Sequence, residues 1–476
     1  MNELAIELTP GTDKCLYQQI YEYIRQEIRT GKLPKNEKLP STRSLAEYLQ
    51  ISRSTVDSAY GQLLAEGYIT AKPCKGYFVC GIEDMVDLSD KRIEQTVKEE
   101  NAEEVKGEIL IRYDFSPHAI SMKNFPFATW KKITREILVD ANSEMFALGN
   151  PQGDFELRST IGRYLHSSRG VNCKPEQIII GAGNDYLLML LEKILGRHIP
   201  MAMENPTYRR AYQVFESFGY GIEVLPMDEC GLSTKALADS QAKVAYVMPS
   251  HQFPTGTVMP IGRRLELLKW AEQEEGRYLI EDDYDSEFRY RGKPIPSLQA
   301  SDRSGKVIYI GTFSKSIAPA IRVGYMVLPT PLMKKYKENC GFYASTVSRI
   351  DQRILNEFIK NGYFERYLNK MRKIYRDKHD FLLEQMKGME KAFIISGENA
   401  GLHLLLTSRT GIEEKELLER AKQAGVRLYG MSNTLFGQMK ENHPYKSTVL
   451  LGYGALGKEE IEQGIGLLKK AWRDFL

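Results

Sequence analysis

The sequence of 476 residues predicts a small N-terminal domain of helices and a hairpin, a large α/β domain and a smaller α+β lobe. Two short helical segments with serine caps and a following hairpin define the first domain. Short apolar runs that alternate with helical patterns define the second, because strands that alternate with helices form a parallel sheet. A helix-rich stretch followed by mixed segments defines the lobe. The chain also exceeds the usual length of one domain.

The bulk composition is that of an ordinary globular protein, with 42% hydrophobic and 27% charged residues. The formal net charge of +3 neither requires nor excludes nucleic acid, so any DNA contact must come from a local patch. The six cysteines are scattered without a paired spacing, which indicates a reducing compartment. The sequence shows no signal-peptide pattern and no apolar run that could span a bilayer. We therefore expect a cytoplasmic protein with no membrane partner.

The N-terminal domain begins with a helix predicted between residues 16 and 30, where apolar residues recur at every fourth position. Ser41 and Ser52 are suitable N-caps for two further short helices, which a brief turn separates. The inward-facing residues of these two helices are Leu45, Ala46 and Leu49, and Val56, Tyr60, Leu63 and Leu64. This pattern predicts a helix-turn-helix.

A hairpin predicted over residues 68–79, with Lys75 and Gly76 at its tip, follows the helix-turn-helix as a wing. We therefore assign residues 12–80 to a winged helix-turn-helix domain. The next segment, residues 81–108, holds ten acidic and four basic residues and few apolar ones. Such a segment cannot bury enough surface to order itself well, so we interpret it as an acidic linker.

The α/β domain is predicted over residues 109–476, with the large lobe extending to about residue 335 and the small lobe over 336–476. The short apolar runs that predict its strands are QIIIGAG, KVAYVMPS, RYLIEDDYD, KVIYIGTF and VGYMVLP, and in the small lobe AGLHLLL, GVRLYGM and TVLLGYG. His403 lies in the run AGLHLLL between leucines, and we expect it to be a packed strand residue.

Lys315 lies in the segment GTFSKSIAPAIRVGY, a small turn rich in hydroxyl groups that follows a predicted strand. A lysine in a partly desolvated pocket has a lowered pKa and attacks carbonyl groups to form Schiff bases. Pyridoxal 5'-phosphate is the commonest cofactor held in this way. It requires a lysine, a carboxylate for its pyridinium nitrogen, and donors for its phosphate. The ordinary alternative for a lysine is a surface position.

Other segments supply the remaining groups, because residues at the carboxyl ends of parallel strands line the ligand crevice. Asp282 follows one such strand and is the candidate partner of the pyridinium nitrogen. Tyr284 is the candidate for the phenolic oxygen of the ring and Tyr208 for stacking on its face. The candidate phosphate donors are Ala182 and Gly183 through backbone N–H groups at a helix start, with Thr312, Ser314 and Arg322 through their side chains.

Each of these features alone has an ordinary explanation: a glycine-rich turn, a capping aspartate or a surface lysine. Their joint order, however, resembles a fold-type I aminotransferase from about residue 114 to the end, through FPFATW, NPQGDFELR, GAGNDYLL, ENPTY, SHQFPTG, EDDYDSEF and TFSKSIAPAIRVGY. The first 80 residues resemble a GntR-type winged helix, through LPSTRSLAEYL, SRSTVDSAYGQLLAEGY and KGYFV. The combination resembles the MocR/GabR family of bacterial transcriptional regulators.

This resemblance implies that the chain binds pyridoxal 5'-phosphate as a Schiff base on Lys315, with Asp282 at the ring nitrogen and Arg322 at the phosphate. It also implies a head-to-tail homodimer that binds double-stranded DNA at an operator with two half-sites. The candidate DNA-binding residues are Ser41, Arg43, Ser52, Arg53, Ser54, Thr55, Lys75 and Gly76. For Arg53 and Lys75 the alternative is an exposed side chain without a DNA contact. No metal site is predicted.

Three positions depart from the aminotransferase pattern. Phe253 stands where an asparagine usually contacts the phenolic oxygen, and His251 or Gln252 is the candidate substitute. Leu148 stands where many relatives have a tyrosine that reaches the partner's phosphate. The segment GMSNTLFGQMK has no arginine for a substrate carboxylate, and Arg427 lies just before it in a predicted strand.

The sequence thus favours a transcriptional regulator that senses pyridoxal phosphate or a small amino acid or amine. Arg210, or its neighbour Arg209, is the candidate contact for an effector carboxylate. Because the carboxylate arginine is missing, we lean toward the cofactor itself as the effector. The alternatives are a catalytically active aminotransferase with a DNA-binding appendage, and a GntR regulator whose second domain no longer binds a cofactor. The retained Lys315, Asp282 and Arg322 argue against the last of these.

Overall fold

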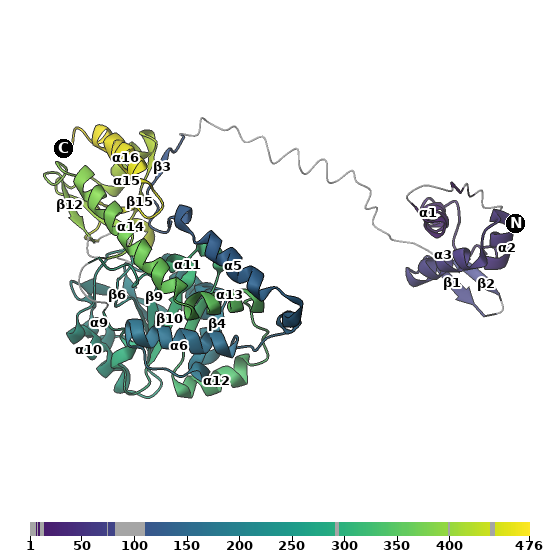
Figure 1. Cartoon of the computed structure of the whole chain (residues 1–476), viewed down its shortest axis with the longest axis horizontal. Coiled ribbons are helices and arrows are strands. Elements are labelled where there is room, and N and C mark those ends of the chain that lie inside the picture. The colour runs from purple at the N-terminus through teal and green to yellow at the C-terminus, as the bar shows by residue number, and fades with distance from the viewer. Residues whose placement is uncertain are drawn as a thin grey trace. The chain divides into compact units, whose positions relative to one another are not determined.

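The computed structural model describes residues 6, 8–9, 14–73, 75–80, 110–290, 295–397, 400–437 and 443–476. The chain divides into two compact units, Met1–Lys106 and Gly107–Leu476, which are shown in Figure 1. The predicted linker lies outside the described residues. None of the described helices combines the length and the apolar character needed to cross a membrane.

In its described residues, the first unit contains three helices and a two-stranded sheet. Its elements are α1 (Leu16–Arg29), α2 (Thr42–Leu49), α3 (Arg53–Ala65), β1 (Ile69–Lys72) and β2 (Gly76–Val79). The apolar stripe of α1 is buried at Ile20, Ile24 and Ile28, and α1 packs against α3. The strands pair antiparallel with Lys72 opposite Gly76. The predicted winged helix-turn-helix is therefore confirmed.

Both predicted serine caps are present in this unit. The side-chain oxygen of Ser41 accepts a hydrogen bond from the N–H of Ser44 at 3.1 Å, and that of Ser52 accepts one from the N–H of Thr55 at 3.3 Å. These bonds satisfy N–H groups that have no partner within the helix. Gln50 adopts a left-handed conformation with a φ of 55° and ends α2, which produces the tight turn before α3.

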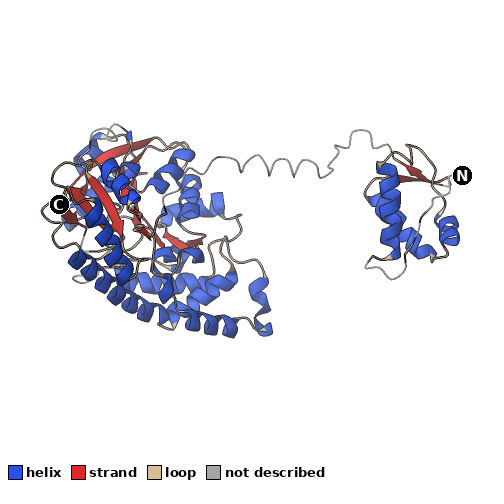
Figure 2. Ribbon diagram, turned by 90° about the horizontal axis from the view of Figure 1, so that it is seen from above, coloured by secondary structure: helices blue, strands red, loops and turns tan. Residues whose placement is uncertain are grey.

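The second unit is built on an eight-stranded sheet in the order β4-β11-β10-β9-β8-β5-β6-β7. Its strands are β4 (Ile178–Gly181), β5 (Met201–Asn205), β6 (Ile222–Asp228), β7 (Gly231–Leu232), β8 (Val244–Val247), β9 (Tyr278–Asp283), β10 (Val307–Thr312) and β11 (Gly324–Val327). Alternate residues face different cores: Ile178 and Ile180 pack in one, and Ile179 packs in the other. This period of two places helices on both sides of the sheet, as Figure 2 shows.

The sheet is mixed, which corrects the prediction of a parallel one. Strand β11 is antiparallel to both β10 and β4, and β7 is antiparallel to β6. The physical reason lies in the connection from β10 to β11, which contains only the short helix α11 (Phe313–Ser316) and the 3-10 turn η5 (Pro319–Ile321). A parallel neighbour would need a longer crossover.

Helices of the large lobe are α5 (Phe127–Ile137), α6 (Phe155–Arg169), α7 (Asn184–Leu195), α8 (Arg209–Ser217), α9 (Thr234–Asp239), α10 (Ile261–Glu272), α12 (Thr330–Cys340) and α13 (Arg349–Lys360). The predicted lobe boundary at residue 336 falls inside α12, whose buried face packs against α7. Helix α13 packs against α5 and α6, so the chain remains with the large lobe through α13.

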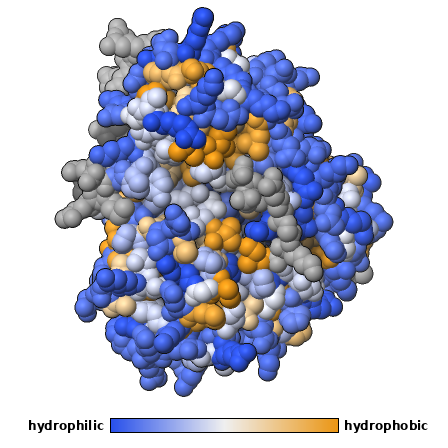
Figure 3. All heavy atoms as spheres, turned by 90° about the vertical axis from the view of Figure 1, so that its left-hand side faces the viewer, coloured by the Kyte–Doolittle hydropathy of each residue, from blue (hydrophilic) through white to orange (hydrophobic). Residues whose placement is uncertain are grey.

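The small lobe contains an antiparallel sheet in the order β12-β13-β16-β15. Its elements are the helix α14 (Tyr363–Gln385), β12 (Phe393–Ser396), β13 (His403–Ser408), α15 (Glu414–Gln423), β14 (Val426–Arg427), β15 (Tyr429–Gly430), β16 (Thr448–Gly452) and α16 (Lys458–Ala471). Strand β14 pairs instead with β3 (Tyr113–Asp114). The face of the molecule in Figure 3 is mainly hydrophilic, with apolar atoms in smaller groups. The predicted smaller α+β lobe is confirmed.

Candidate functional site

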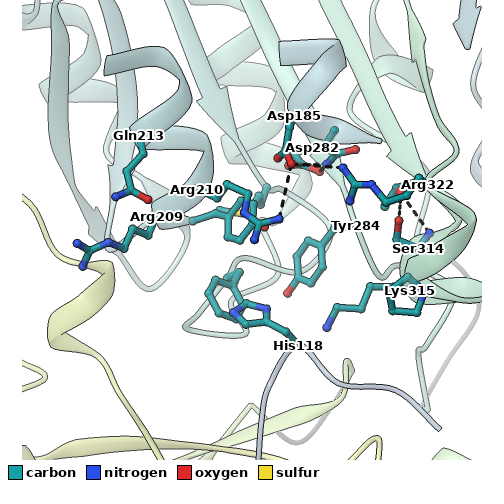
Figure 4. Close-up of a pocket in the computed structure, with 16 residues that line it drawn as sticks. His118, Asp185, Arg209, Arg210, Gln213, Asp282, Tyr284, Ser314, Lys315 and Arg322 are labelled. Atoms are coloured by element: carbon teal, nitrogen blue, oxygen red, sulfur yellow. Dashed lines mark hydrogen bonds and ion pairs between the residues drawn. The ribbon is translucent and has the colours of Figure 1, made fainter. Parts of the chain in front are cut away.

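A cavity of about 440 Å³ opens at the carboxyl ends of β8, β9 and β10, beside the start of α7 (Figure 4). This is the edge at which α/β sheets bind ligands. The residues predicted from the sequence that line the cavity are Tyr208, Arg210, Asp282, Tyr284, Thr312, Ser314, Lys315 and Arg322. Further lining residues that were not predicted are His118, Asn184, Asp185, Gln213, Met248 and Pro319. Phe253 and Arg209 complete the wall.

Lys315 reaches the cavity from α11, which begins where β10 ends. Its side-chain nitrogen donates a 2.7 Å hydrogen bond to the carbonyl oxygen of Pro117. Burial lowers the pKa of the Lys315 amine to about 8, although the nearby Asp285 carboxylate acts in the opposite direction. A pKa near 8 leaves a useful fraction of neutral amine at physiological pH, which a nucleophile for carbonyl groups requires.

Asp282 lies near the end of β9 and is buried. The Tyr246 hydroxyl donates a short hydrogen bond to its carboxylate, and Asn184 Nδ2 lies 3.4 Å from Oδ1 of Asp282. Burial raises the pKa of Asp282 to about 7, the Tyr246 hydrogen bond opposes that shift, and the Asp283 carboxylate adds to it. A buried carboxylate with a raised pKa lacks a cation, and a pyridinium N–H would supply one.

Tyr284 belongs to a buried network behind the cavity. Its hydroxyl lies 3.0 Å from Nδ1 of His251, and that nitrogen lies 2.9 Å from a carboxylate oxygen of Asp285. Burial, followed by the Asp285 charge, raises the pKa of Tyr284 well above its usual value, so the phenol remains protonated. His251 and Gln252 do not line the cavity, and the Gln252 amide donates to the carbonyl oxygen of Pro206.

At the start of α7, both predicted N–H groups have hydrogen-bond partners within the protein. Ala182 does not line the cavity, because its N–H donates to the side-chain oxygen of Thr346 at 3.1 Å. The N–H of Gly183 donates to the carbonyl oxygen of Gly181 at 2.7 Å. In this structure neither predicted N–H group is free for a phosphate. The first N–H groups of the helix itself, from Asn184 onward, have no partner within the helix and start beside the cavity.

Arg322 and Arg210 flank the same carboxylate in the cavity, as Figure 4 shows. Nη2 of Arg322 lies 3.3 Å from Oδ2 of Asp185, and Nη1 of Arg210 lies 3.6 Å from the same oxygen. Nη2 of Arg322 also donates to the carbonyl oxygen of Ala182 at 3.2 Å. Two guanidinium groups beside a helix N-terminus form a strongly positive region that suits an anion.

Hydroxyl groups and aromatic rings form the rest of the site. The side-chain oxygen of Thr312 accepts from the N–H of Ser314 at 3.1 Å and caps α11. The Tyr208 ring lies 6.0 Å from that of Phe253, and the His118 ring lies 5.2 Å from Phe253. Burial, followed by the charges of Lys315 and then Arg210, lowers the pKa of His118 from 6.5 to about 4, so this imidazole is neutral.

The structure also gives positions for Arg427, Leu148 and His403, which the sequence singled out. Arg427 does not line the cavity; Nη1 lies 3.9 Å from Oδ2 of Asp114 on the neighbouring strand β3. Among the described residues, the last one in the sequence that lines the cavity is Arg322, so no residue of the small lobe lines it. Leu148 is 93% exposed. His403 is buried in β13 with Nε2 2.9 Å from the carbonyl oxygen of Pro254, as the flanking leucines predict.

The candidate DNA-binding residues lie on exposed parts of the first unit. The Arg53 side chain, at the start of α3, is 67% exposed and has Nε 3.5 Å from Oδ2 of Asp57. The Arg43 side chain on α2 is 80% exposed and donates to Glu47 at 3.1 Å. Lys75 and Gly76 form the tip of the hairpin. Ser41 and Ser52 are helix caps, and Ser54 and Thr55 belong to the first turn of α3.

Comparison with known proteins gives matches to both units. Residues 16–79 match the bacterial regulatory proteins of the gntR family, and residues 121–433 match aminotransferase class I and II. The chain is 42% identical to the HTH-type transcriptional regulator YdeL of Bacillus subtilis, over 98% of this chain and all of that protein. It is 31% identical to MocR of Rhizobium meliloti, named for rhizopine catabolism regulation, over 98% and 95% of the two chains.

Among solved structures, the kynurenine aminotransferase of Pyrococcus horikoshii superposes with a TM-score of 0.67 and 25% identity, covering 82% of this chain and 96% of that one. The fold and the cavity therefore define a regulator with an aminotransferase-like domain. The chain belongs to the MocR-type family of HTH transcriptional regulators, which join a GntR domain to an aminotransferase class I and II domain. GntR-type regulators bind DNA, and the aminotransferase class I and II fold binds pyridoxal phosphate.

Proposed function

We propose that this regulator binds pyridoxal 5'-phosphate in the cavity and that occupancy of the cavity changes its binding to operator DNA. The observation that carries the proposal is the Lys315 amine, whose pKa is lowered to about 8 in a cavity that also contains the buried Asp282 carboxylate. A nucleophilic amine and a carboxylate that lacks a cation are the two groups that the cofactor's ring requires.

The cavity residues fit the parts of the cofactor in a consistent way. Lys315 would bind the aldehyde, Asp282 would hold the proton of the ring nitrogen, and Tyr284 would lie near the phenolic oxygen. Tyr208 would cover a ring face. Arg322, Ser314 and the start of α7 would bind the phosphate. When bound, the cofactor supplies a carbonyl carbon that reacts with amines and a ring that withdraws electrons.

We propose the cofactor itself as the effector, with an amino acid or amine as the alternative. An α-amino acid needs its carboxylate held, ideally by a bidentate arginine. The described cavity lining has no arginine from the small lobe, and Arg210 already lies 3.6 Å from Asp185. Arg209 is the other nearby candidate, and Nη1 of Arg209 lies 3.5 Å from the carbonyl oxygen of Asn433.

A catalytically active aminotransferase with a DNA-binding appendage is the second candidate. The fold similarity to aminotransferases and the group of Lys315, Asp282 and Tyr284 in one cavity favour it. An aminotransferase would convert the bound cofactor to its amine form when an amino acid is added. The absorbance of the cofactor reports this conversion directly, so one titration separates the two candidates.

We further propose a head-to-tail homodimer that binds two half-sites of DNA in the cytoplasm. Large apolar side chains on the second unit are exposed near the start of α6, with Leu148 at 93%, Phe146 at 74% and Phe155 at 56%. Leu148 and Phe155 line one surface depression together with Arg349 and Arg353. An apolar surface of this kind is typical of an interface.

The central test is attachment of the cofactor to Lys315. Purified protein mixed with pyridoxal phosphate should acquire the absorbance band of a lysine-bound cofactor, and borohydride should fix the cofactor to the Lys315 peptide. Lys315→Ala should lose this adduct. Lys378 is the internal control, because burial also lowers its pKa to about 8 but it does not line the cavity.

Three outcomes would reject parts of the proposal. An adduct on Lys378 instead of Lys315, or no band with excess cofactor, would reject the cavity as the cofactor site. Operator binding is then measured with cofactor-free and cofactor-loaded protein. Equal affinity and footprint in both forms, with a change only after an amino acid is added, would reject the cofactor as effector.

A further inference from the structure

The cavity contains two carboxylates in different surroundings. Asp282 is buried and receives a hydrogen bond from Tyr246. Asp185 lies instead at the start of α7, with one oxygen 3.3 Å from Arg322 and 3.6 Å from Arg210. Figure 4 shows Asp185 between the two guanidinium groups. The carboxylate of Asp185 therefore lies at the end of the cavity where we place the ligand's phosphate.

The backbone conformation of Arg322 and the contacts of its guanidinium fix its position. Arg322 has a positive φ of 50°, and its Nη2 also donates to the carbonyl oxygen of Ala182 at 3.2 Å. Gly183 allows this approach, because a Cβ atom there would lie 2.8 Å from Nη2 of Arg322. The guanidinium of Arg322 thus lies against the N-terminus of α7. Its charge and the partial positive charge of the helix end repel each other unless an anion is present.

We propose that Asp185 is an internal anion that occupies Arg322 in the ligand-free cavity, so that a ligand phosphate must displace it. This inference rests on the proposed function and adds a regulatory residue to it. The carboxylate would compete with phosphate for Arg322 and would weaken binding of a phosphate ligand. It would leave the contacts of Lys315 and Asp282 with the rest of the ligand unchanged.

This competition has a functional consequence for a sensor. A ligand is sensed only when its occupancy changes over the concentrations that the cell provides, so a regulator needs weaker binding than an enzyme that keeps its cofactor. The side chains of Asp185, Arg322 and Arg210 are 37%, 49% and 59% exposed, so their ion pairs are weak and can be broken. Asp185 would therefore lower affinity without blocking the cavity.

A purely structural role for Asp185 makes a different prediction. An acidic residue in the first turn stabilises a helix through its dipole. Loss of that effect alone would lower thermal stability and would alter the binding of all ligands alike. Competition for Arg322 concerns only ligands that carry a phosphate. A comparison of pyridoxal phosphate with pyridoxal, which lacks the phosphate, separates the two roles.

The experiment is an absorbance titration of the full-length protein with pyridoxal phosphate and with pyridoxal. The variants are Asp185→Asn, Arg322→Gln, the double variant, and Glu338→Gln as a matched control on an exposed part of α12 outside the cavity. We expect Asp185→Asn to bind pyridoxal phosphate about tenfold more tightly than wild type. Pyridoxal affinity should change by less than about twofold. Glu338→Gln should match wild type for both ligands.

The double variant tests whether the effect passes through Arg322. In the Arg322→Gln background, Asp185→Asn should no longer tighten phosphate binding. Equal tightening in that background would show simple charge repulsion and would overturn the inference. Unchanged or weaker binding by Asp185→Asn, or equal tightening for pyridoxal, would also overturn it. If no variant forms a Lys315-bound cofactor at all, the proposed function fails instead.

Discussion

The amine of Lys315 donates a 2.7 Å hydrogen bond to the carbonyl oxygen of Pro117, a residue 198 positions earlier in the chain. The segment around Pro117 is in turn bound to the small lobe: the N–H of Phe115 donates to the carbonyl of Arg427, and the carbonyl of Phe115 accepts from the N–H of Gly452. The reactive amine is thus one hydrogen bond away from a segment attached to the small lobe. A ligand that reacts with Lys315 would remove that bond, so we expect ligand binding to alter the contact between Lys315 and this segment.

The first prediction concerns the pH dependence of cofactor attachment. Because the pKa of Lys315 is lowered from 10.5 to about 8, the neutral amine becomes the major form above that pH. The rate of attachment should rise as the pH increases toward about 8 and become level above about 9. Stopped-flow absorbance with pyridoxal phosphate measures this rate. A rate that continues to rise to pH 10.5 would show an ordinary exposed lysine.

A second prediction concerns Gly183→Ala. The substitution places a Cβ atom 2.8 Å from Nη2 of Arg322 and requires a side chain at a φ of +85°. We expect Arg322 to shift and the affinity for pyridoxal phosphate to fall about tenfold, with a smaller change for pyridoxal. Gly466→Ala on α16 is the matched control, because a Cβ atom there meets nothing within 4 Å. If Gly183→Ala and Gly466→Ala bound pyridoxal phosphate with equal affinity, Gly183 would have no role in phosphate binding.

A third prediction concerns stability and the buried Glu204 on β5. Oε2 of Glu204 accepts from the N–H of Met248 at 3.3 Å, whereas Oε1 has no partner among the described residues. Burial raises the pKa of Glu204 from 4.5 to about 8. Between these two values the unfolded chain ionises and the folded chain does not. The contribution of Glu204 is therefore present at low pH and is lost as the pH rises.

The variant that tests this is Glu204→Gln, which cannot ionise. Relative to it, the free energy of unfolding of the wild type should fall by at most about 1.4 kcal/mol per pH unit between pH 4.5 and 8 and become level above. Urea unfolding at a series of pH values measures the difference, with Glu338→Gln as the exposed control. Parallel profiles for wild type and Glu204→Gln would contradict the raised pKa.

The fourth prediction concerns DNA. Arg53→Ala removes an exposed cation from the first turn of α3 and should weaken operator binding by about 1–3 kcal/mol if the side chain contacts a guanine. Specificity should then relax at one base pair. A phosphate contact would instead weaken binding to all sequences and reduce the salt slope by about one. Arg303→Ala, an exposed arginine on the second unit, is the control. Unchanged binding and salt slope in Arg53→Ala would remove this residue from the DNA surface.

Most of the fold could be predicted because its signals are local. Serine caps, an apolar stripe at every fourth residue and short apolar runs locate helices and strands without knowledge of their neighbours. Strand direction is not local: the run Gly324–Val327 is equally apolar in a parallel or an antiparallel position, so its pairing with β10 and β4 could not be predicted. The direction follows from the short connection that precedes it.

The same distinction applies to the cavity. Lys315, Asp282 and Arg322 occur in segments whose order resembles a known family, so the sequence was sufficient to select them. The N–H of Ala182, a predicted phosphate donor, donates instead to Thr346, and the sequence does not indicate this partner because it is 164 positions away in the chain. His118 reaches the cavity from a distant segment and carries no sequence signal. Asn184 and Asp185 directly follow the glycine turn, so a count of unpaired N–H groups at the helix start would have indicated that position.

The antiparallel pairing of β10 with β11 also bears on the length of the ligands that the cavity can bind. Lys315 and Arg322 lie on the single short connection between these two strands, and their separation is therefore a property of one hairpin rather than of lobe movement. The connection between the two strands thus holds the Lys315 amine and the Arg322 guanidinium at a set separation. A molecule whose carbonyl and anionic groups are spaced too closely or too widely would contact either Lys315 or Arg322 but not both, so we expect this one connection to select ligands by length.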